Sequence, residues 1–246
     1  MKPFTTGHPS IGTFQIFDSL QITESLGVAG IDFVVFDQEH SSLTASDTLP
    51  LCVAAENANM VPVIRVRSNL PSEIQRALDL GGGVQIPQIE TIEDAKAAVD
   101  ASRFDPIGHR GLSQYNRAGK YAGMDEYTKL QNESQLVVLQ IEGKSGIENA
   151  SEIIRVPGFD VLFVGPYDLS QSLGIPGEIT HPDVTDAIES VVELGEKSNV
   201  AIGGFADDVA MANDLINLGM KYITLAVDAP LFVKSVEDQL NQIRKG

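Results

Sequence analysis

Two acidic residues follow two neighbouring apolar segments in the middle of the chain. Glu142 comes directly after the segment 136–141, and Asp168 follows the segment 161–164. The helix-length stretch between the segments favours parallel strands joined by a crossover helix. Ligands of parallel α/β folds collect beyond the carboxyl ends of the strands, where two carboxylates can bind one hard divalent cation. The structural alternative is that Glu142 caps a helix and Asp168 holds a turn.

Other polar residues at the ends of predicted elements could also act on a ligand. His40 is a candidate proton carrier, because imidazole titrates near neutral pH without perturbation. Arg65 ends an otherwise apolar segment, where a guanidinium requires an anionic partner from the protein or from a ligand. Gln140 could donate to a ligand oxygen or satisfy the backbone. Asp79 ends a predicted helix, where the negative end of the helix dipole disfavours an acidic residue, and this penalty points to another role.

The elements that would position these residues alternate between strand and helix along the whole chain. Predicted strands cover residues 11–17, 32–36, 61–66, 83–89, 136–141, 161–164, 200–205 and 222–227. Predicted helices include residues 49–59, 71–80, 92–102, 147–155, 184–197, 208–218 and 231–243. This alternation predicts an α/β protein with a (β/α)8 TIM barrel, formed as a single domain over residues 1–246. The long connection 105–134 is typical of a functional lid or a subunit contact.

Composition restricts the partners and the location that we expect. The 34 acidic and 17 basic residues give a formal net charge of −17, which argues against nucleic-acid and anionic-membrane partners. The single cysteine, Cys52, cannot form an intrachain disulfide, which fits a reducing cytoplasm. The amino terminus lacks the apolar core of a signal peptide, and no apolar run approaches the roughly 18 residues of a membrane span. We therefore expect a cytoplasmic protein without a membrane anchor.

Several short motifs occur in order from Gly12 to about residue 235. An apolar run that ends in Asp-x-Glu-His covers residues 33–40, and Arg65 follows in the next predicted strand. The others are Leu-Asp-x-Gly at 78–81, Pro-x-Gly-x-Arg-Gly at 106–111, Gln-Ile-Glu at 140–142, Gly-Pro-x-Asp-Leu-Ser at 165–170 and His-Pro at 181–182. Together these motifs resemble the HpcH/HpaI family of metal-dependent, class II pyruvate aldolases. The resemblance implies a TIM barrel that acts on 4-hydroxy-2-oxo acids.

The resemblance also implies a role for each matching residue. Glu142 and Asp168 are expected to bind a divalent cation, Mg²⁺ or Mn²⁺, with Co²⁺ as a further candidate. Arg65 is expected to stabilise the enolate charge. His40, paired with Asp79, is expected to act as acid and base through a water molecule. The expected substrate contacts are Gln140, Gly165 and Tyr167.

The implied reaction is the reversible cleavage of a 4-hydroxy-2-oxo acid to pyruvate, or a close analogue, and an aldehyde. The resemblance further implies a homohexamer, a trimer of dimers, in which the last helix is exchanged between subunits. Two residues depart from the better-known members of the family. Gly143 stands where Thr or Ser is common, and Tyr167 stands where a small residue is frequent. Because the second position borders the pocket, Tyr167 leaves the substrate range open.

Three other interpretations fit parts of the pattern. A barrel lyase of the citrate-lyase β-subunit type would share the acidic pair and the arginine but act on an acyl-thioester. A Schiff-base aldolase would need a desolvated lysine, and Lys144 lies beyond a predicted strand rather than in one. The third is a non-catalytic barrel that binds a 2-oxo acid.

Overall fold

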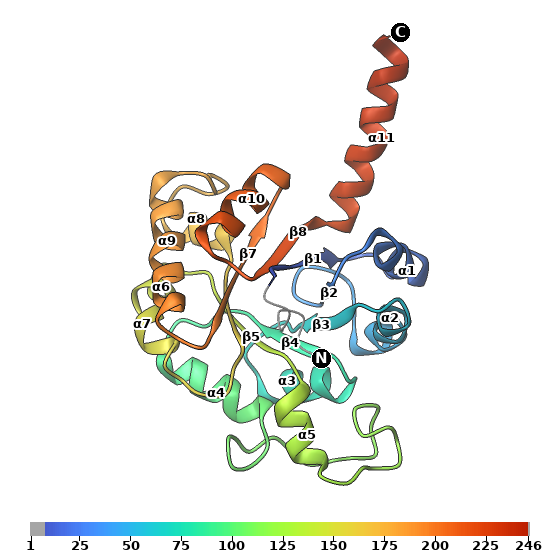
Figure 1. The fold of residues 1–246 in the computed structure, drawn as a ribbon, viewed down its shortest axis with the longest axis vertical. Coiled ribbons are helices and arrows are strands. Elements are labelled where there is room, and N and C mark those ends of the chain that lie inside the picture. Colours follow the sequence, from blue (N-terminus) through green and yellow to red (C-terminus); the bar gives the residue numbers. More distant parts are fainter. Residues whose placement is uncertain (1–7, 246) are drawn as a thin grey trace.

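Within residues 8–245, which the computed structural model describes, eight parallel strands close into a barrel surrounded by helices (Figure 1). The strands pair in sequence order, and the last strand closes the ring against the first. They are β1 (Ser10–Gln15), β2 (Phe33–Asp37), β3 (Val61–Arg65), β4 (Gly83–Ile86), β5 (Val137–Ile141), β6 (Val161–Val164), β7 (Ala201–Ala206) and β8 (Tyr222–Val227). The predicted TIM barrel is confirmed.

Helices follow the strands and cover the outside of the barrel (Figure 1). They are α1 (Leu20–Ala29), α2 (Ala45–Asn57), α3 (Pro71–Asp79), α4 (Ile92–Ser102), α5 (Tyr127–Ser134), α6 (Lys144–Glu148), α7 (Ala150–Ile153), α8 (Pro166–Ser172), α9 (Pro182–Glu196), α10 (Val209–Leu218) and α11 (Asp228–Lys245). Local sequence sets their ends, as α10 illustrates. At its start Asp208 accepts a hydrogen bond from the Met211 N–H at 2.9 Å, and at its end Gly219 adopts a left-handed conformation with φ 112°.

Three predicted elements differ from the structure. The predicted helix 147–155 is replaced by α6 and α7, which meet at Asn149. The connection 105–134 contains the short helix α5, whose largely polar sequence gave no helical apolar pattern. The predicted strand 83–89 ends at Ile86, because Pro87 has no N–H for the ladder and Gln88 has a positive φ of 61°.

Aromatic rings fill the interior of the barrel. The ring of Phe33 stacks on Tyr222 with centroids 4.0 Å apart, and Phe163 meets Tyr222 edge-on at 6.2 Å. Phe14 lies edge-on to Phe163 at 6.4 Å. All four side chains are buried. The barrel is therefore a packed core, and only the space beyond these rings is open to a ligand.

The last helix, α11, projects from the barrel instead of lying along it (Figure 1). Its apolar side chains are exposed in a single copy of the chain. They are Leu231, Phe232, Val233, Val236, Leu240 and Ile243. Residues 8–245 include no helix that is both long enough and apolar enough to cross a membrane.

Candidate active site

A cavity of about 440 Å³ opens at the carboxyl ends of the strands, beyond the rings of Phe14 and Phe163. The structure places seven of the residues proposed from sequence on its lining, and these are His40, Arg65, Gln140, Glu142, Gly165, Tyr167 and Asp168. The ends of four different strands, β2, β3, β5 and β6, thus bring an acidic pair, a guanidinium and an imidazole to one cavity. Asp79 lines a different cavity.

Glu142 is buried directly after β5, and both of its carboxylate oxygens accept hydrogen bonds. Oε1 accepts from the backbone N–H of Gln88 at 2.8 Å, and Oε2 accepts from the side-chain amide of Gln140. Burial, together with the charges of Glu39 and Asp168, raises the pKa of Glu142 to about 7, although the Gln140 hydrogen bond lowers it. Asp168 lies in the first turn of α8, where the helix dipole favours a negative charge.

Gly165 gives Glu142 the space that its carboxylate occupies. A Cβ atom at Gly165 would lie 3.0 Å from the Cβ of Glu142 and 3.1 Å from its Oε2. It would also meet the Gln140 amide at 3.5 Å. A side chain at this position would therefore push against the acidic residue from the neighbouring strand.

Arg65 is held in place by two hydrogen bonds that its guanidinium donates to the carboxylate of Asp37. The Arg65 Nε donates to Asp37 Oδ1 at 2.9 Å, and Nη2 donates to Oδ2 at 2.7 Å. Nη1 lies 3.4 Å from Glu39 Oε2, and the ring of Phe14 lies 4.6 Å below the guanidinium carbon. Burial alone would lower the pKa of Arg65, but the hydrogen bonds and charges of Asp37 and Glu39 raise it. The guanidinium is thus fixed, charged and directed at the cavity.

Asp37 and Glu39 received no role in the sequence analysis, although both belong to the segment 33–40. The signal that could have identified Asp37 is strand register, because Asp37 and Arg65 are direct partners in the pairing of β2 with β3. Only 8% of the Glu39 side chain is exposed, and its Oε2 has no hydrogen-bond partner among the described residues. Burial and the charges of Asp37 and Asp168 raise the pKa of Glu39, whereas Arg65 lowers it.

His40 lies at the rim of the cavity, with 62% of its side chain exposed. Its Nε2 is 3.8 Å from Glu39 Oε2. The backbone N–H groups of Glu39 and His40 both donate to Asp37 Oδ1, at 3.0 and 3.3 Å. Asp37 therefore fixes the turn that presents the imidazole as well as the guanidinium of Arg65.

Asp79 lies at the carboxyl end of α3, close to the start of β4 and so at the opposite end of the barrel from His40. Its Oδ1 accepts a hydrogen bond from Arg110 Nη2 at 2.7 Å. The cavity that it lines is shared with Arg76 and Arg117. Within one copy of the chain, the structure does not bring Asp79 and His40 together.

Tyr167 closes one side of the cavity. Its hydroxyl donates to Asp207 Oδ2 at 2.6 Å, and its ring packs edge-on against Phe205 with centroids 5.9 Å apart. Burial, and then the hydrogen bond to Asp207, raises the pKa of Tyr167 to about 12. The phenol is therefore neutral and anchored between the loops that follow β6 and β7.

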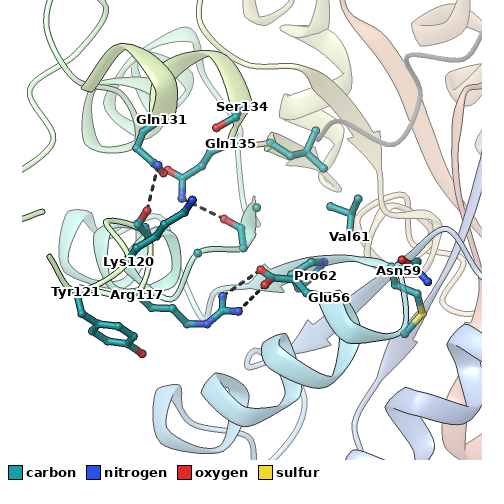
Figure 2. A pocket seen from close by; sticks show the side chains of 16 residues that line it. Glu56, Asn59, Val61, Pro62, Arg117, Lys120, Tyr121, Gln131, Ser134 and Gln135 are labelled. Atoms are coloured by element: carbon teal, nitrogen blue, oxygen red, sulfur yellow. Dashed lines mark hydrogen bonds and ion pairs between the residues drawn. The ribbon is translucent and has the colours of Figure 1, made fainter. Parts of the chain in front are cut away.

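A second cavity, of about 690 Å³, lies at the amino ends of β3 to β5 (Figure 2). Arg117 crosses it and donates to both carboxylate oxygens of Glu56, at 3.0 and 2.5 Å (Figure 2). Its Nη1 also donates to the Leu80 carbonyl at 2.8 Å. None of the residues proposed for chemistry lines this cavity, and Arg117 and Glu56 form a structural ion pair in it.

The acidic pair fits a bound divalent cation. Within the described part of the chain, residues 8–245, no group of three or more His, Cys, Asp and Glu side chains is arranged to enclose a metal ion. A site formed by Glu142 and Asp168 alone would keep open positions for a ligand and for water, as oxygen-binding Mg²⁺ and Mn²⁺ sites do. A cation there would offset the repulsion between carboxylates that contributes to the raised pKa of Glu142.

Known proteins share this architecture over nearly the whole chain. A 2-dehydro-3,6-dideoxy-6-sulfogluconate aldolase of Pseudomonas putida is 32% identical, with 94% of this chain and 91% of the relative covered. A 5-keto-4-deoxy-D-glucarate aldolase of Shigella boydii serotype 18 is 32% identical over 96% and 92% of the two chains. The crystal structure of a HpcH/HpaI aldolase/citrate lyase family protein from Burkholderia cenocepacia J2315 matches with a TM-score of 0.93 and 33% identity, over 98% of this chain and 97% of the other.

Fold and site together define a barrel enzyme with an acidic pair and a fixed arginine at the carboxyl ends of its strands. The family described as HpcH/HpaI aldolase/citrate lyase matches residues 11–235, and the chain belongs to this family. It is a carbon–carbon lyase of the aldolase type. The two aldolases above are named for different sugar acids at the same identity, so the likeness does not select a substrate.

Proposed function

We propose that the chain is a metal-dependent pyruvate aldolase, which reversibly cleaves a 4-hydroxy-2-oxo acid to pyruvate, or a close analogue, and an aldehyde. The observation that carries this proposal is the fixed guanidinium of Arg65 in the same cavity as Glu142 and Asp168. A cation and a guanidinium that face one cavity suit a substrate whose carboxylate and keto oxygen both carry negative charge during the reaction.

The acidic pair would hold the metal and Arg65 would act on the reacting fragment. Glu142 and Asp168 are the proposed ligands of Mg²⁺ or Mn²⁺, with Co²⁺ as an alternative. When bound, the cation supplies Lewis acidity to the keto group. Arg65 stabilises the charge that develops when the C3–C4 bond breaks, and Asp37 keeps its donors aligned so that no reorganisation is needed. Gln140, which is buried beside Glu142, orients the 2-oxo acid.

His40 is the proposed acid and base. It takes the proton from the C4 hydroxyl during cleavage, through a water molecule, and returns it during condensation. Its exposed position at the rim suits contact with water. The pairing with Asp79 that the family resemblance implies would require a second copy of the chain, since the two residues lie at opposite ends of one barrel.

We further propose a homohexamer, a trimer of dimers, in which α11 is exchanged between the barrels of two copies. The exposed apolar side chains of α11 support this arrangement, because a projecting helix with a wide apolar surface gains free energy by packing on a partner. As an aldolase, the chain acts on small-molecule substrates. The absence of nucleic-acid partners and a cytoplasmic location are proposed on the sequence arguments alone.

Charges placed on the apolar surface of α11 are expected to dissociate the assembly. In the double variant Phe232→Glu and Val236→Glu, each carboxylate would be buried against an apolar partner surface without a counter-charge. Light scattering coupled to size exclusion should show a smaller species than the unmodified chain forms. The control is Asn241→Glu, which adds a charge to the same helix on the face opposite Phe232 and Val236. An unchanged mass in the double variant would contradict the exchange of α11.

The direct test of the proposed function is a screen of 4-hydroxy-2-oxo acids with Mn²⁺ or Mg²⁺ present and pyruvate release as the readout. Cleavage of one or more of these acids is the expected result. Turnover of an acyl-thioester instead would favour the citrate-lyase β-type alternative. Tight binding of pyruvate without cleavage of any acid would favour the non-catalytic barrel.

The Tyr167→Ala variant is expected to accept bulkier 2-oxo acids than the unmodified chain does. The phenol occupies one wall of the cavity, and Asp207 and Phe205 hold it there, so its removal opens space beside Asp168. Relative kcat/KM for pyruvate and larger 2-oxo acids in the condensation direction gives the measurement. Tyr167→Phe retains the ring and should retain the original preference. Equal preferences among 2-oxo acids in the unmodified chain, Tyr167→Ala and Tyr167→Phe would show that the ring does not border the bound 2-oxo acid.

A further inference from the structure

The strand β4 ends in a bulge beside the acidic pair. Pairing of β4 with β5 runs as far as Ile86 and resumes at Ile89, whose N–H donates to the Gln140 carbonyl at 3.0 Å. Gln88 lies in the bulge with φ 61°, a left-handed conformation that costs free energy for a residue other than glycine. Bulges at the rim of a barrel redirect groups into active sites, and strained residues persist only where surrounding contacts enforce them.

The left-handed conformation directs two polar groups of Gln88 at two carboxylates of the site. The backbone N–H donates to Glu142 Oε1 at 2.8 Å, and the side-chain Nε2 donates to Glu39 Oε1 at 3.1 Å. The other oxygen of Glu39 lies 3.4 Å from Arg65 Nη1 and 3.8 Å from His40 Nε2. One residue therefore connects the proposed metal ligand to the segment that carries the proposed acid and base.

We propose that Gln88 is a positioning residue that sets the orientation of both Glu142 and Glu39. Its N–H holds one carboxylate oxygen of Glu142 in a fixed direction, and the lone pairs that neither Gln88 nor Gln140 occupies remain available to a cation in the cavity. Its amide orients Glu39, whose other carboxylate oxygen lies 3.4 Å from Arg65 Nη1 and 3.8 Å from His40 Nε2. The inference rests on the proposed function for its effect on turnover, whereas its effect on metal affinity can be measured without turnover.

The backbone role is tested by comparing Gln88→Gly with Gln88→Val in calorimetric titrations with Mn²⁺. Glycine keeps the positive φ and the N–H, so its Mn²⁺ affinity should stay close to that of the unmodified chain. Valine is β-branched and resists the left-handed region, so the N–H should move away from Glu142. Because Gln88→Val loses a hydrogen bond to a charged group, its Mn²⁺ binding should be weaker than that of the unmodified chain by about tenfold or more.

The matched control uses Asn59, which also has a positive φ, 63°, but lies exposed at the other end of the barrel. Both Asn59→Gly and Asn59→Val should bind Mn²⁺ as the unmodified chain does. Circular dichroism melting curves of all four variants identify any that fails to fold. Equal Mn²⁺ affinities for Gln88→Gly and Gln88→Val, or an equal loss in Asn59→Val, would overturn the backbone role.

The side-chain role is tested with Gln88→Met, which keeps the length of the side chain and removes its donor. We expect kcat to fall by about tenfold at an unchanged KM, since a hydrogen bond to a carboxylate is lost while the acidic pair stays in place. In the double variant Gln88→Met and Glu39→Ala, the fold reduction of kcat should be smaller than the product of the two single-variant reductions, because both substitutions remove the same contact. An unchanged kcat in Gln88→Met would overturn this role. So would a double variant whose reduction of kcat equals the product of the two single-variant reductions.

The measurements separate failure of the inference from failure of the proposed function. If no 4-hydroxy-2-oxo acid is cleaved but the Gly and Val variants still differ in Mn²⁺ affinity, the proposed function is wrong and the backbone role holds. If cleavage occurs but all Gln88 variants match the unmodified chain in both readouts, the proposed function holds and the inference is wrong.

Discussion

Chelation of divalent metal is expected to abolish aldol cleavage by this chain, and addition of Mn²⁺, Mg²⁺ or Co²⁺ is expected to restore it. The cavity holds one fixed guanidinium and two carboxylates that face a common space, and without a cation these carboxylates repel one another. The Lewis acidity needed to polarise the keto group would then be missing. Pyruvate release, measured before and after dialysis against a chelator, gives the result directly.

Asp168→Ala should lose both Mn²⁺ binding and cleavage, since one of only two proposed protein ligands is removed. The matched control is Asp183→Ala, because Asp183 is the exposed acidic residue in the first turn of α9 and has the same relation to its helix dipole. That control should retain Mn²⁺ affinity and turnover.

Borohydride added together with pyruvate should trap no covalent adduct. Among residues 8–245 the lysines lie outside the cavity lining, and Lys144 at the start of α6 has 65% of its side chain exposed, next to Glu148. A lysine that forms an imine is activated by desolvation in an apolar pocket, and this exposed side chain lacks such an environment. A pyruvyl adduct on Lys144, with cleavage that survives chelation, would make the acidic pair structural and favour the Schiff-base mechanism.

Arg65→Ala should lower kcat by roughly 10²–10³-fold, the loss typical of one preorganised charge contact to a transition state. Mn²⁺ affinity should change little, because Arg65 binds Asp37 rather than the acidic pair. Steady-state kinetics and Mn²⁺ titration on the same preparation separate the two effects. Arg65→Lys keeps a charge but loses the planar fork, so an intermediate kcat is expected.

Arg67→Ala is the control for this experiment, because Arg67 is exposed and pairs at the surface with Glu73 at 3.0 Å. Exposed ion pairs contribute little, so its kcat should equal that of the unmodified chain. A near-normal kcat in Arg65→Ala would remove the guanidinium from the proposed chemistry and leave it as a structural partner of Asp37.

The barrel could be predicted from sequence because its strands are buried on both sides and appear as apolar runs separated by helix-length stretches. The ends of elements were harder to predict. The strand predicted over residues 83–89 stops three residues early, since Pro87 and the backbone conformation of Gln88 decide the end rather than hydrophobicity. The break at Asn149 likewise depends on its amide, which donates to the Glu90 carbonyl at 2.8 Å.

Convergence of the site residues follows from one simple rule, that the carboxyl ends of parallel strands share one face of the barrel. The same rule explains the position of Asp79, because a helix that returns antiparallel to the strands ends at the opposite face. The side-chain contacts within the site could not be predicted from the sequence. The bonds from Arg65 to Asp37 and from Tyr167 to Asp207 depend on register and on loop conformation, which a linear pattern of residue types does not encode.

The hydrogen bond between Tyr167 and Asp207 couples two positions that lie 40 residues apart in the sequence. A change from Tyr167 to a small residue leaves the exposed Asp207 carboxylate without this donor, whereas loss of Asp207 alone frees the Tyr167 ring from its anchor. The effects of substitutions at the two positions are therefore expected to be non-additive, because the two residues share one contact. The range of 2-oxo acids accepted by this chain should therefore respond to changes at Asp207 as well as at Tyr167, although Asp207 does not line the cavity.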